Sequence, residues 1–292
     1  GGANKGGRMF WIICAALTAA VGLAIMAPLM RARATAAQPA AAQVADLRST
    51  TQFRVCADPA NAPMSVRDGS GFENKLAEAF GRWLGLPVTY TWFPSGMGFI
   101  AKTLRAGECD VVMGYAQGDE LVQNTNHYYT SVFGIVTRKN SELADVDRLS
   151  DPALKGHPIG VVAGSPPATI MAQAGLAKDM RGADLFVDRR VKDPVGDLIR
   201  GVKDGTLDAA VLWGPLAGPR VKNDPDLQFT PLLKETAGPK MFYRITMGVR
   251  LPEQEWKREL NSLIRRHQDD INAILREAGV PLVDDYGKEL IQ

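Results

Sequence analysis

The side chains that carry most protein chemistry are sparse in this 292-residue chain. Its three histidines, His127, His157 and His267, lie far apart, and none has a partner at metal-ligand spacing. The sequence contains no Gly-x-Ser-x-Gly, P-loop, Gly-x-Gly-x-x-Gly or Cys-His pair, so no nucleophile has a base within reach along the chain. We therefore expect a binding protein with no catalytic residue, no metal and no cofactor.

Glu73 is the carboxylate that best fits a position in a cleft. A dehydratase-type enzyme could use such a group for proton transfer. The commoner explanation is an acidic residue at the start of a helix, where it interacts favourably with the helix dipole. We retain Glu73 as a candidate binding residue and keep a cleft enzyme as the third functional hypothesis.

Other polar candidates follow predicted β-strands. Asp58 and Asn61 lie in the turn-rich segment after the first strand, and Gln117 follows the third. Ser165 starts a helix whose amides could face an anion, although a helix merely begun by the two prolines after it is an equal alternative. Ligands of parallel α/β sheets bind beyond the carboxyl ends of the strands, so these positions suit a binding site.

Aromatic and proline residues mark the same strand ends. The candidates are Trp92, Phe93, Tyr115, Tyr128, Trp213 and Pro215. Aromatic side chains that face each other across a cleft would suit an apolar or peptide-like ligand, or a segment of a partner protein. The alternative is that each of them packs separately in the core.

The elements that would position these residues alternate between strands and helices. The first predicted strands are 53–57, 88–92 and 110–114, and the first predicted helices are 73–84 and 99–105. Such alternation predicts right-handed βαβ units with parallel strands. The plan of 100–114 recurs at 198–213, which indicates two similar α/β lobes, although helix-glycine-strand joints are common in α/β proteins of any kind.

A second set of elements follows. The predicted strands are 131–137, 159–162, 184–187, 209–213, 227–231 and 242–249. After Pro252, apolar residues from Trp256 to Ala278 form one helical stripe that includes His267 and ends at Gly279. We expect this stripe to pack on the first lobe.

The N-terminal segment is typical of an export signal. Lys5 and Arg8 precede an uncharged run over 9–30, and small residues follow. An uncleaved anchor is the alternative, because the run would just span a bilayer of about 30 Å. Residues 1–36 hold four of the 34 basic residues and none of the 32 acidic ones, so the remainder carries a formal charge of −2 and gives no support for nucleic-acid binding.

Two cysteines remain after this segment. Cys56 ends the first strand and Cys109 precedes the third, and these strands are neighbours in a doubly wound sheet. Export to an oxidising compartment predicts a disulfide between them. The alternative is a pair of buried free thiols.

Several short runs resemble a known family. They are Arg54-Val55-Cys56-Ala57-Asp58-Pro59, Gly71-Phe72-Glu73-Asn74, Cys109-Asp110-Val111-Val112-Met113-Gly114 and Val211-Leu212-Trp213-Gly214-Pro215. Over 53–281 the chain resembles the binding proteins associated with quinoprotein dehydrogenases, the J-type accessory proteins MxaJ and XoxJ. These belong to the extracellular solute-binding proteins of family 3. The resemblance implies a type II periplasmic binding protein: an α/β fold of two lobes, each a doubly wound, mostly parallel sheet, joined by two crossover strands.

The resemblance also implies a division of the chain. Residues 1–37 would be the signal peptide and 38–50 a flexible leader. Lobe 1 would comprise 51–130 plus 249–292, and lobe 2 would comprise 131–248. Amino-acid binders of this fold grip the ligand carboxylate with an arginine, but 115–124 contains no Arg or Lys, so a free amino acid is not expected as the ligand. Met64 stands where relatives carry an aromatic residue.

The functional prediction follows from the resemblance. It implies an exported, soluble periplasmic accessory protein of a PQQ-dependent methanol or alcohol dehydrogenase, which engages the dehydrogenase through its cleft during maturation or activation. The expected partners are the large subunit of the dehydrogenase and its cytochrome, and the small-molecule or peptide ligand is not specified. The alternative is a small-molecule receptor of an ABC importer.

Overall fold

A computed structural model of the chain describes residues 47–118, 121–183 and 192–291. Its strands are β1 (Phe53–Ala57), β2 (Ala60–Asn61), β3 (Ser65–Val66), β4 (Val88–Trp92), β5 (Val111–Ala116), β6 (Gln123–Asn124), β7 (Tyr129–Arg138), β8 (Ile159–Val162), β9 (Met180–Ala183), β10 (Ala209–Trp213), β11 (Leu227–Pro231) and β12 (Phe242–Val249). Its helices are α3 (Phe72–Leu84), α4 (Phe99–Lys102), α5 (Pro166–Gln173), α6 (Pro194–Asp204), α7 (Gly214–Val221), α8 (Gln254–Arg266) and α9 (Gln268–Ala278), and a 3₁₀ turn covers Pro152–Leu154.

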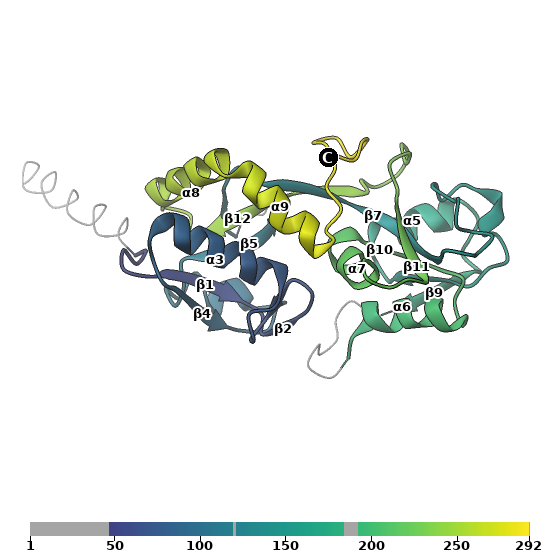
Figure 1. Cartoon of the computed structure of the whole chain (residues 1–292), viewed down its shortest axis with the longest axis horizontal. Coiled ribbons are helices and arrows are strands. Elements are labelled where there is room, and N and C mark those ends of the chain that lie inside the picture. The colour runs from purple at the N-terminus through teal and green to yellow at the C-terminus, as the bar shows by residue number, and fades with distance from the viewer. Residues whose placement is uncertain (1–46, 119–120, 184–191, 292) are drawn as a thin grey trace, which may run out of the picture. The chain divides into compact units, whose positions relative to one another are not determined.

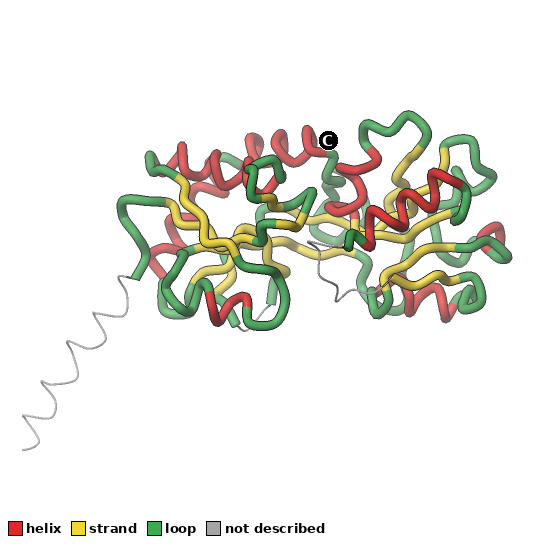
Figure 2. Tube along the Cα trace, turned by 90° about the horizontal axis from the view of Figure 1, so that it is seen from below, coloured by secondary structure: helices red, strands yellow, loops and turns green. Residues whose placement is uncertain are grey.

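The predicted α/β fold is confirmed. A mixed sheet runs in the order β4-β1-β5-β12-β7-β10-β8-β9, with β6 beside β12 and β11 beside β7 (Figure 1). Parallel pairs link β4, β1 and β5, and another parallel set links β10, β8 and β9. The long strands β7 and β12 run antiparallel to each other and to the strands on either side. Helices lie on both faces of the strands (Figure 2).

Separate hydrophobic cores form around the two parallel sets. Phe53 of β1 packs against Phe80 of α3 and Trp256 of α8, with ring centroids 6.5 and 6.0 Å apart. α9 completes this core with Ile271 and Leu275. Around the second parallel set, the buried residues include Ile135, Leu154, Ile159, Met171 and Val211. The helical stripe after Pro252 therefore packs with the first set of strands, as expected.

α3 begins where the β2–β3 hairpin meets it. The backbone N–H groups of Phe72 and Glu73 donate to the carbonyls of Pro63 and Met64, which satisfies two donors at the helix start. A side chain at Gly71 would overlap the Met64 carbonyl, so this approach requires glycine. The hairpin thus fixes the position of Glu73 on the first turn of α3.

Several boundaries differ from the sequence-based expectation, among them those of β7, expected over 131–137, and of α3, expected over 73–84. The helix expected over 99–105 ends at Lys102, because Thr103 leaves helical geometry and the Leu104 carbonyl accepts a hydrogen bond from Arg250. The stripe after Pro252 is two helices rather than one, and it breaks at His267, whose ring stacks on Trp83 at 3.9 Å. The third strand runs from Val111 to Ala116 instead of 110–114.

Two predicted segments lie outside the described residues. They are the signal peptide and most of its leader, and the strand expected over 184–187; β9 occupies the positions immediately before that strand. Within the described ranges, no helix is both long and apolar enough to cross a membrane.

The predicted Cys56–Cys109 disulfide is present, with Cα atoms 5.4 Å apart. β1 and β5 are neighbours in the sheet, as the pairing requires. Both cysteines are buried with Phe99, Ile100 and Leu104.

An aspartate precedes the strand in each copy of the repeated plan, and the structure gives both the same role. Asp110 accepts a two-point contact from Arg54, from Nε at 2.9 Å and Nη2 at 2.8 Å. Asp208 accepts a hydrogen bond from Arg138 at 2.9 Å, and the same arginine donates to the Leu207 carbonyl. Each arginine comes from a neighbouring strand, so each aspartate ties two strands together at their ends.

The chain after α9 returns to β7 and α7. The Val283 N–H donates to the Thr130 carbonyl at 3.0 Å, and the Ser131 hydroxyl donates to the Pro281 carbonyl at 2.5 Å. A side chain at Gly218 of α7 would overlap the Gly279 carbonyl. Because Val280, Leu282 and Val283 are buried, the first residues of this C-terminal tail, which comprises 280–291, are part of the core.

Candidate functional site

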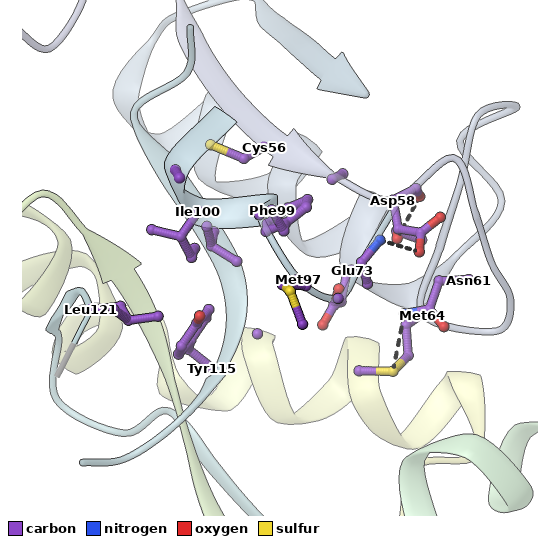
Figure 3. Close-up of a pocket in the computed structure, with 18 of the residues that line it drawn as sticks. Cys56, Asp58, Asn61, Met64, Glu73, Met97, Phe99, Ile100, Tyr115 and Leu121 are labelled. Atoms are coloured by element: carbon purple, nitrogen blue, oxygen red, sulfur yellow. Dashed lines mark hydrogen bonds between the residues drawn. The ribbon is translucent and has the colours of Figure 1, made fainter. Parts of the chain in front are cut away.

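A pocket of about 510 Å³ lies at the carboxyl ends of β1 and β5, which we call the Glu73 pocket (Figure 3). It is lined by Cys56, Ala57, Asp58, Asn61, Met64, Ser65, Glu73, Ser95, Gly96, Met97, Gly98, Phe99, Ile100, Ala101, Arg105, Val112, Gly114, Tyr115 and Leu121. Four of the predicted residues line this one cavity: Asp58, Asn61 and Tyr115, which lie at strand ends, and Glu73 at the start of α3.

Asp58 organises the loops at the mouth of this pocket. Its Oδ1 accepts from the Ala60 N–H at 2.8 Å, and its Oδ2 accepts from the Ser95 N–H at 2.9 Å. The side chain is buried. Hydrogen bonds from two backbone amides hold the β1–β2 turn against the segment after β4, so Asp58 shapes the pocket.

The carboxyl of Glu73, unlike that of Asp58, is not held by backbone amides of the described residues. Its Oε2 atom is buried and has no hydrogen-bond partner among the residues that the structure describes. The carboxyl packs against Gly114 so closely that a Cβ atom there would overlap it. Burial raises the pKa of Glu73 to about 7, because the charged form loses its hydration. Figure 3 shows this carboxyl in the middle of the lining residues.

Nearby tyrosines share this buried environment. Burial raises the pKa of Tyr90, and burial raises the pKa values of Tyr128 and Tyr129 well above their ordinary value, with the charge of Glu73 adding to each effect. The Tyr128 hydroxyl donates to the Met113 carbonyl. These phenols are therefore neutral neighbours of the carboxyl.

The remaining walls are mostly apolar. Met64, Phe99, Ile100 and Tyr115 line the pocket, together with the exposed side chains of Met97 and Leu121. Among the lining residues in the described part of the chain, Arg105 is the one basic side chain, and it is exposed. A pocket with apolar walls and buried carboxyls suits a ligand that has an apolar body and a hydrogen-bond donor.

The other predicted residues lie elsewhere. Trp92 stacks on Tyr90 with centroids 4.5 Å apart, and Phe93 packs on Phe99 at 6.5 Å. Gln117 follows β5 and donates its backbone N–H to the Arg244 carbonyl. Ser165 precedes α5, where its hydroxyl donates to the Val162 carbonyl.

Trp213 belongs to a second aromatic cluster. Its ring lies 5.0 Å from Phe133 and 5.4 Å from the partly exposed Tyr243, and Pro215 is buried in the first turn of α7. β10 ends at Trp213, as the Gly-Pro sequence after it predicts. This cluster and the Glu73 pocket have no lining residue in common.

The sequence-based candidate set did not include several lining residues. Met97 and its neighbours lie in the Ser95–Gly98 loop that follows β4, so the strand-end rule applied to the second strand could have found them. No feature of the sequence predicted that the pocket is also lined by Ile100, Arg105 and Leu121. Across the described ranges, no group of three or more His, Cys, Asp or Glu side chains could hold a metal ion.

The fold agrees with the comparisons to known proteins. The family model for bacterial extracellular solute-binding proteins, family 3, matches residues 53–277, and the chain belongs to this family. The fold is that of the type II periplasmic binding proteins. Within the family the chain is similar to MoxJ of Methylorubrum extorquens, with 32% identity over 293 residues that cover 92% of this chain and 94% of MoxJ.

Two solved structures of J-type proteins are similar to this chain. The periplasmic binding protein XoxJ from Methylobacterium extorquens is 36% identical, with a TM-score of 0.68 over 80% of this chain and 100% of XoxJ. MxaJ from Methylophaga aminisulfidivorans is 24% identical, with a TM-score of 0.67 over 80% of this chain and 100% of MxaJ, a likeness of fold. The predicted resemblance to J-type proteins is confirmed.

Proposed function

We propose that this chain is a periplasmic accessory binding protein of a PQQ-dependent methanol dehydrogenase, which it engages during maturation or activation. The observation that carries the proposal is similarity to MoxJ and XoxJ over nearly their whole length. The large subunit is the proposed partner, with the cytochrome as a second contact. XoxJ is a periplasmic binding protein, and the N-terminal export signal supports the same location for this chain.

The proposed domain division accompanies this function. Residues 1–37 form the signal peptide and 38–50 the leader. Lobe 1 is 51–130 plus 249–292, and lobe 2 is 131–248. The separate hydrophobic cores around the two parallel strand sets support the division, with β7 and β12 as the connecting strands.

Binding without catalysis is part of the proposal. XoxJ is a binding protein, and the sequence offers no nucleophile paired with a base. A receptor of an ABC importer is the second candidate, favoured by the size of the Glu73 pocket, which lies in the range of small-molecule sites. The two candidates differ in the expected ligand. An accessory protein should bind the dehydrogenase, whereas an importer receptor should bind a small solute.

Deletion of the gene in its host tests the proposal. We expect loss of methanol-dependent growth and of methanol dehydrogenase activity, with both restored by the wild-type gene. We also expect the tagged protein to co-purify with apo or immature dehydrogenase. Growth and dehydrogenase activity that stay intact after deletion would exclude the accessory role.

A double variant tests whether the predicted cleft contacts the dehydrogenase. Trp213→Ala combined with Tyr115→Ala should weaken capture of the dehydrogenase by about tenfold or more, since each change removes a large aromatic surface. Tyr286→Ala is the matched control, because this tyrosine is 67% exposed on the C-terminal tail. Equal capture by the double variant and the control would place the contact elsewhere.

A further inference from the structure

Within the described part of the chain, the Oε2 atom of Glu73 is an acceptor without a donor. This atom is buried, yet the described residues offer it no N–H or O–H group. A buried acceptor without a partner is unfavourable, and a ligand that supplies a donor removes that penalty. The residue lines a pocket of about 510 Å³, so a ligand in this pocket would lie beside its carboxyl group.

The charges around the pocket favour a cation over an anion. Asp58 and Glu73 both line it, and Asp58 already accepts two backbone amides. Arg105 is exposed, and no cation in the described chain lowers the pKa of Glu73. A positively charged donor would form the strongest hydrogen bond with this carboxyl.

The walls of the pocket define the rest of the ligand. Met64, Phe99, Ile100 and Tyr115 present apolar surface beside the carboxyl, and Met97 is fully exposed on the adjoining loop. Thioether and aromatic side chains pack readily on a short alkyl chain. A small, strongly hydrated cation without such a chain would leave these walls uncovered.

We propose that the Glu73 pocket binds a primary ammonium group carried on an apolar stem, with the Glu73 carboxyl as the acceptor of its hydrogen bond. The ammonium group belongs either to a free alkylamine or to a lysine or N-terminal amine of a protein. Only the choice of the dehydrogenase as that protein rests on the proposed function.

This arrangement links binding to the release of a proton. The pKa of Glu73 is about 7 in the free protein, so a cation that needs the ionised carboxyl must displace its proton. The other titratable or charged groups around Glu73 in the described ranges are Asp58 after β1, Tyr90 of β4, Arg105 after α4, Tyr115 of β5 and the Tyr128–Tyr129 pair at β7. Burial raises the pKa values of Tyr90, Tyr128 and Tyr129, so these three phenols stay neutral between pH 6 and 8.

Titration calorimetry with n-butylamine, which stays protonated over this range, tests the site. The affinity of the wild-type protein should rise about tenfold from pH 6 to pH 8, because the ionised fraction of a carboxyl with a pKa near 7 rises from about a tenth to about nine-tenths. Heats measured at pH 7 in two buffers of different ionisation enthalpy should report release of about half a proton. Butanoate and 1-butanol should bind at least tenfold more weakly than butylamine at pH 8.

Variants assign the effect to one side chain. Glu73→Gln keeps the shape of the acceptor but cannot ionise, so it should bind butylamine more weakly and with equal affinity at pH 6 and pH 8. Glu78→Gln, on the exposed face of the same helix, should behave like the wild type. Circular dichroism would verify that both variants are folded. The proposal is overturned if butylamine does not bind at millimolar concentration, if its pH dependence persists in Glu73→Gln, or if butanol or butanoate binds as tightly.

Competition distinguishes the two sources of the ammonium group. If butylamine displaces the captured dehydrogenase, the group comes from that protein. If the dehydrogenase is captured equally well with the pocket saturated, a free amine is the ligand. If butylamine binds while no dehydrogenase is captured under any condition, the pocket assignment stands and the proposed function fails.

Discussion

Glu73 couples the stability of the chain to pH in the sense opposite to an ion-paired carboxylate. Its pKa is about 7 in the folded chain, against an ordinary value of 4.5. The folded state therefore holds a proton that the unfolded state has released between these values. The contribution of Glu73 is complete below pH 4.5 and is lost as the pH rises through 7.

The expected loss is on the order of 3 kcal/mol of unfolding free energy between pH 4.5 and pH 8, from the size of this shift. Urea unfolding at several pH values measures it, and Glu73→Gln should remove this part of the pH dependence. Glu78→Gln serves as the control on the same helix. A pH profile shared by the wild type and Glu73→Gln would show that the carboxyl does not titrate near neutrality.

For single residues, the sequence predicted four of the side chains that line the Glu73 pocket but not the remaining lining residues. Asp58, Asn61, Glu73 and Tyr115 share a pocket because β1 and β5 are neighbours and α3 starts beside them. Ser165 follows β8 and Trp213 ends β10, and both strands belong to the other parallel set. The strand-end rule does not say which ends face one cavity, since that depends on packing over long separations.

Among the elements, the strands were predicted most accurately. β1, β4, β8, β10, β11 and β12 have the expected bounds, because apolar runs bounded by turn residues define them locally. α4 and the break at His267 could not be predicted, since both depend on distant partners. Arg250 binds the Leu104 carbonyl, and Trp83 stacks on His267.

The two repeated aspartates differ in burial, which predicts different mutational effects. Asp110 is nearly fully buried; burial pulls its pKa upward, but hydrogen bonds from Arg54 and Arg250 outweigh burial and lower it. Asp208 occupies the equivalent position with a side chain that is 27% exposed. Asp110→Asn should therefore leave two arginines poorly paired. Asp208→Asn should lower the stability of the protein much less.

We expect Asp110→Asn to lower the unfolding free energy by about 3 kcal/mol or more, in the range measured for broken buried ion pairs. Asp208→Asn should lower it by about 1 kcal/mol. Urea unfolding of both variants at neutral pH gives the comparison. Equal losses in the two variants would contradict a role for burial.

The disulfide closes a loop of 53 residues between β1 and β5. In the chain-entropy model such a loop contributes about 4 kcal/mol through the unfolded state. The paired variant Cys56→Ser and Cys109→Ser should lose stability of this order. Intact-mass measurement before and after reduction checks the bond itself, and an unchanged mass would exclude it.

On the scale of the whole molecule, the C-terminal tail holds distant elements together. Val280, Leu282 and Val283 are buried, and the tail contacts both β7 and α7. Truncation after Gly279 should cost about 5 kcal/mol, from about 1.5 to 3 kcal/mol for each buried side chain. This is comparable with the total stability of many domains, so we expect a largely unfolded product.

A shorter truncation controls for the length of the chain. Removal of 290–292 deletes the exposed residues Leu290 and Ile291 and should change the unfolding free energy by about 1 kcal/mol or less. Thermal unfolding followed by circular dichroism measures both truncations. A cooperative transition at the wild-type temperature after loss of residues 280–292 would contradict this view of the tail.

Cys56 forms the disulfide with Cys109 and also lines the Glu73 pocket. The oxidation history of a preparation is therefore an experimental variable in any binding assay. Material made in a reducing bacterial cytoplasm would start with both thiols free, whereas material recovered by osmotic shock would start with the bond formed. Affinities from the two routes are comparable only after the thiol content of each batch has been counted.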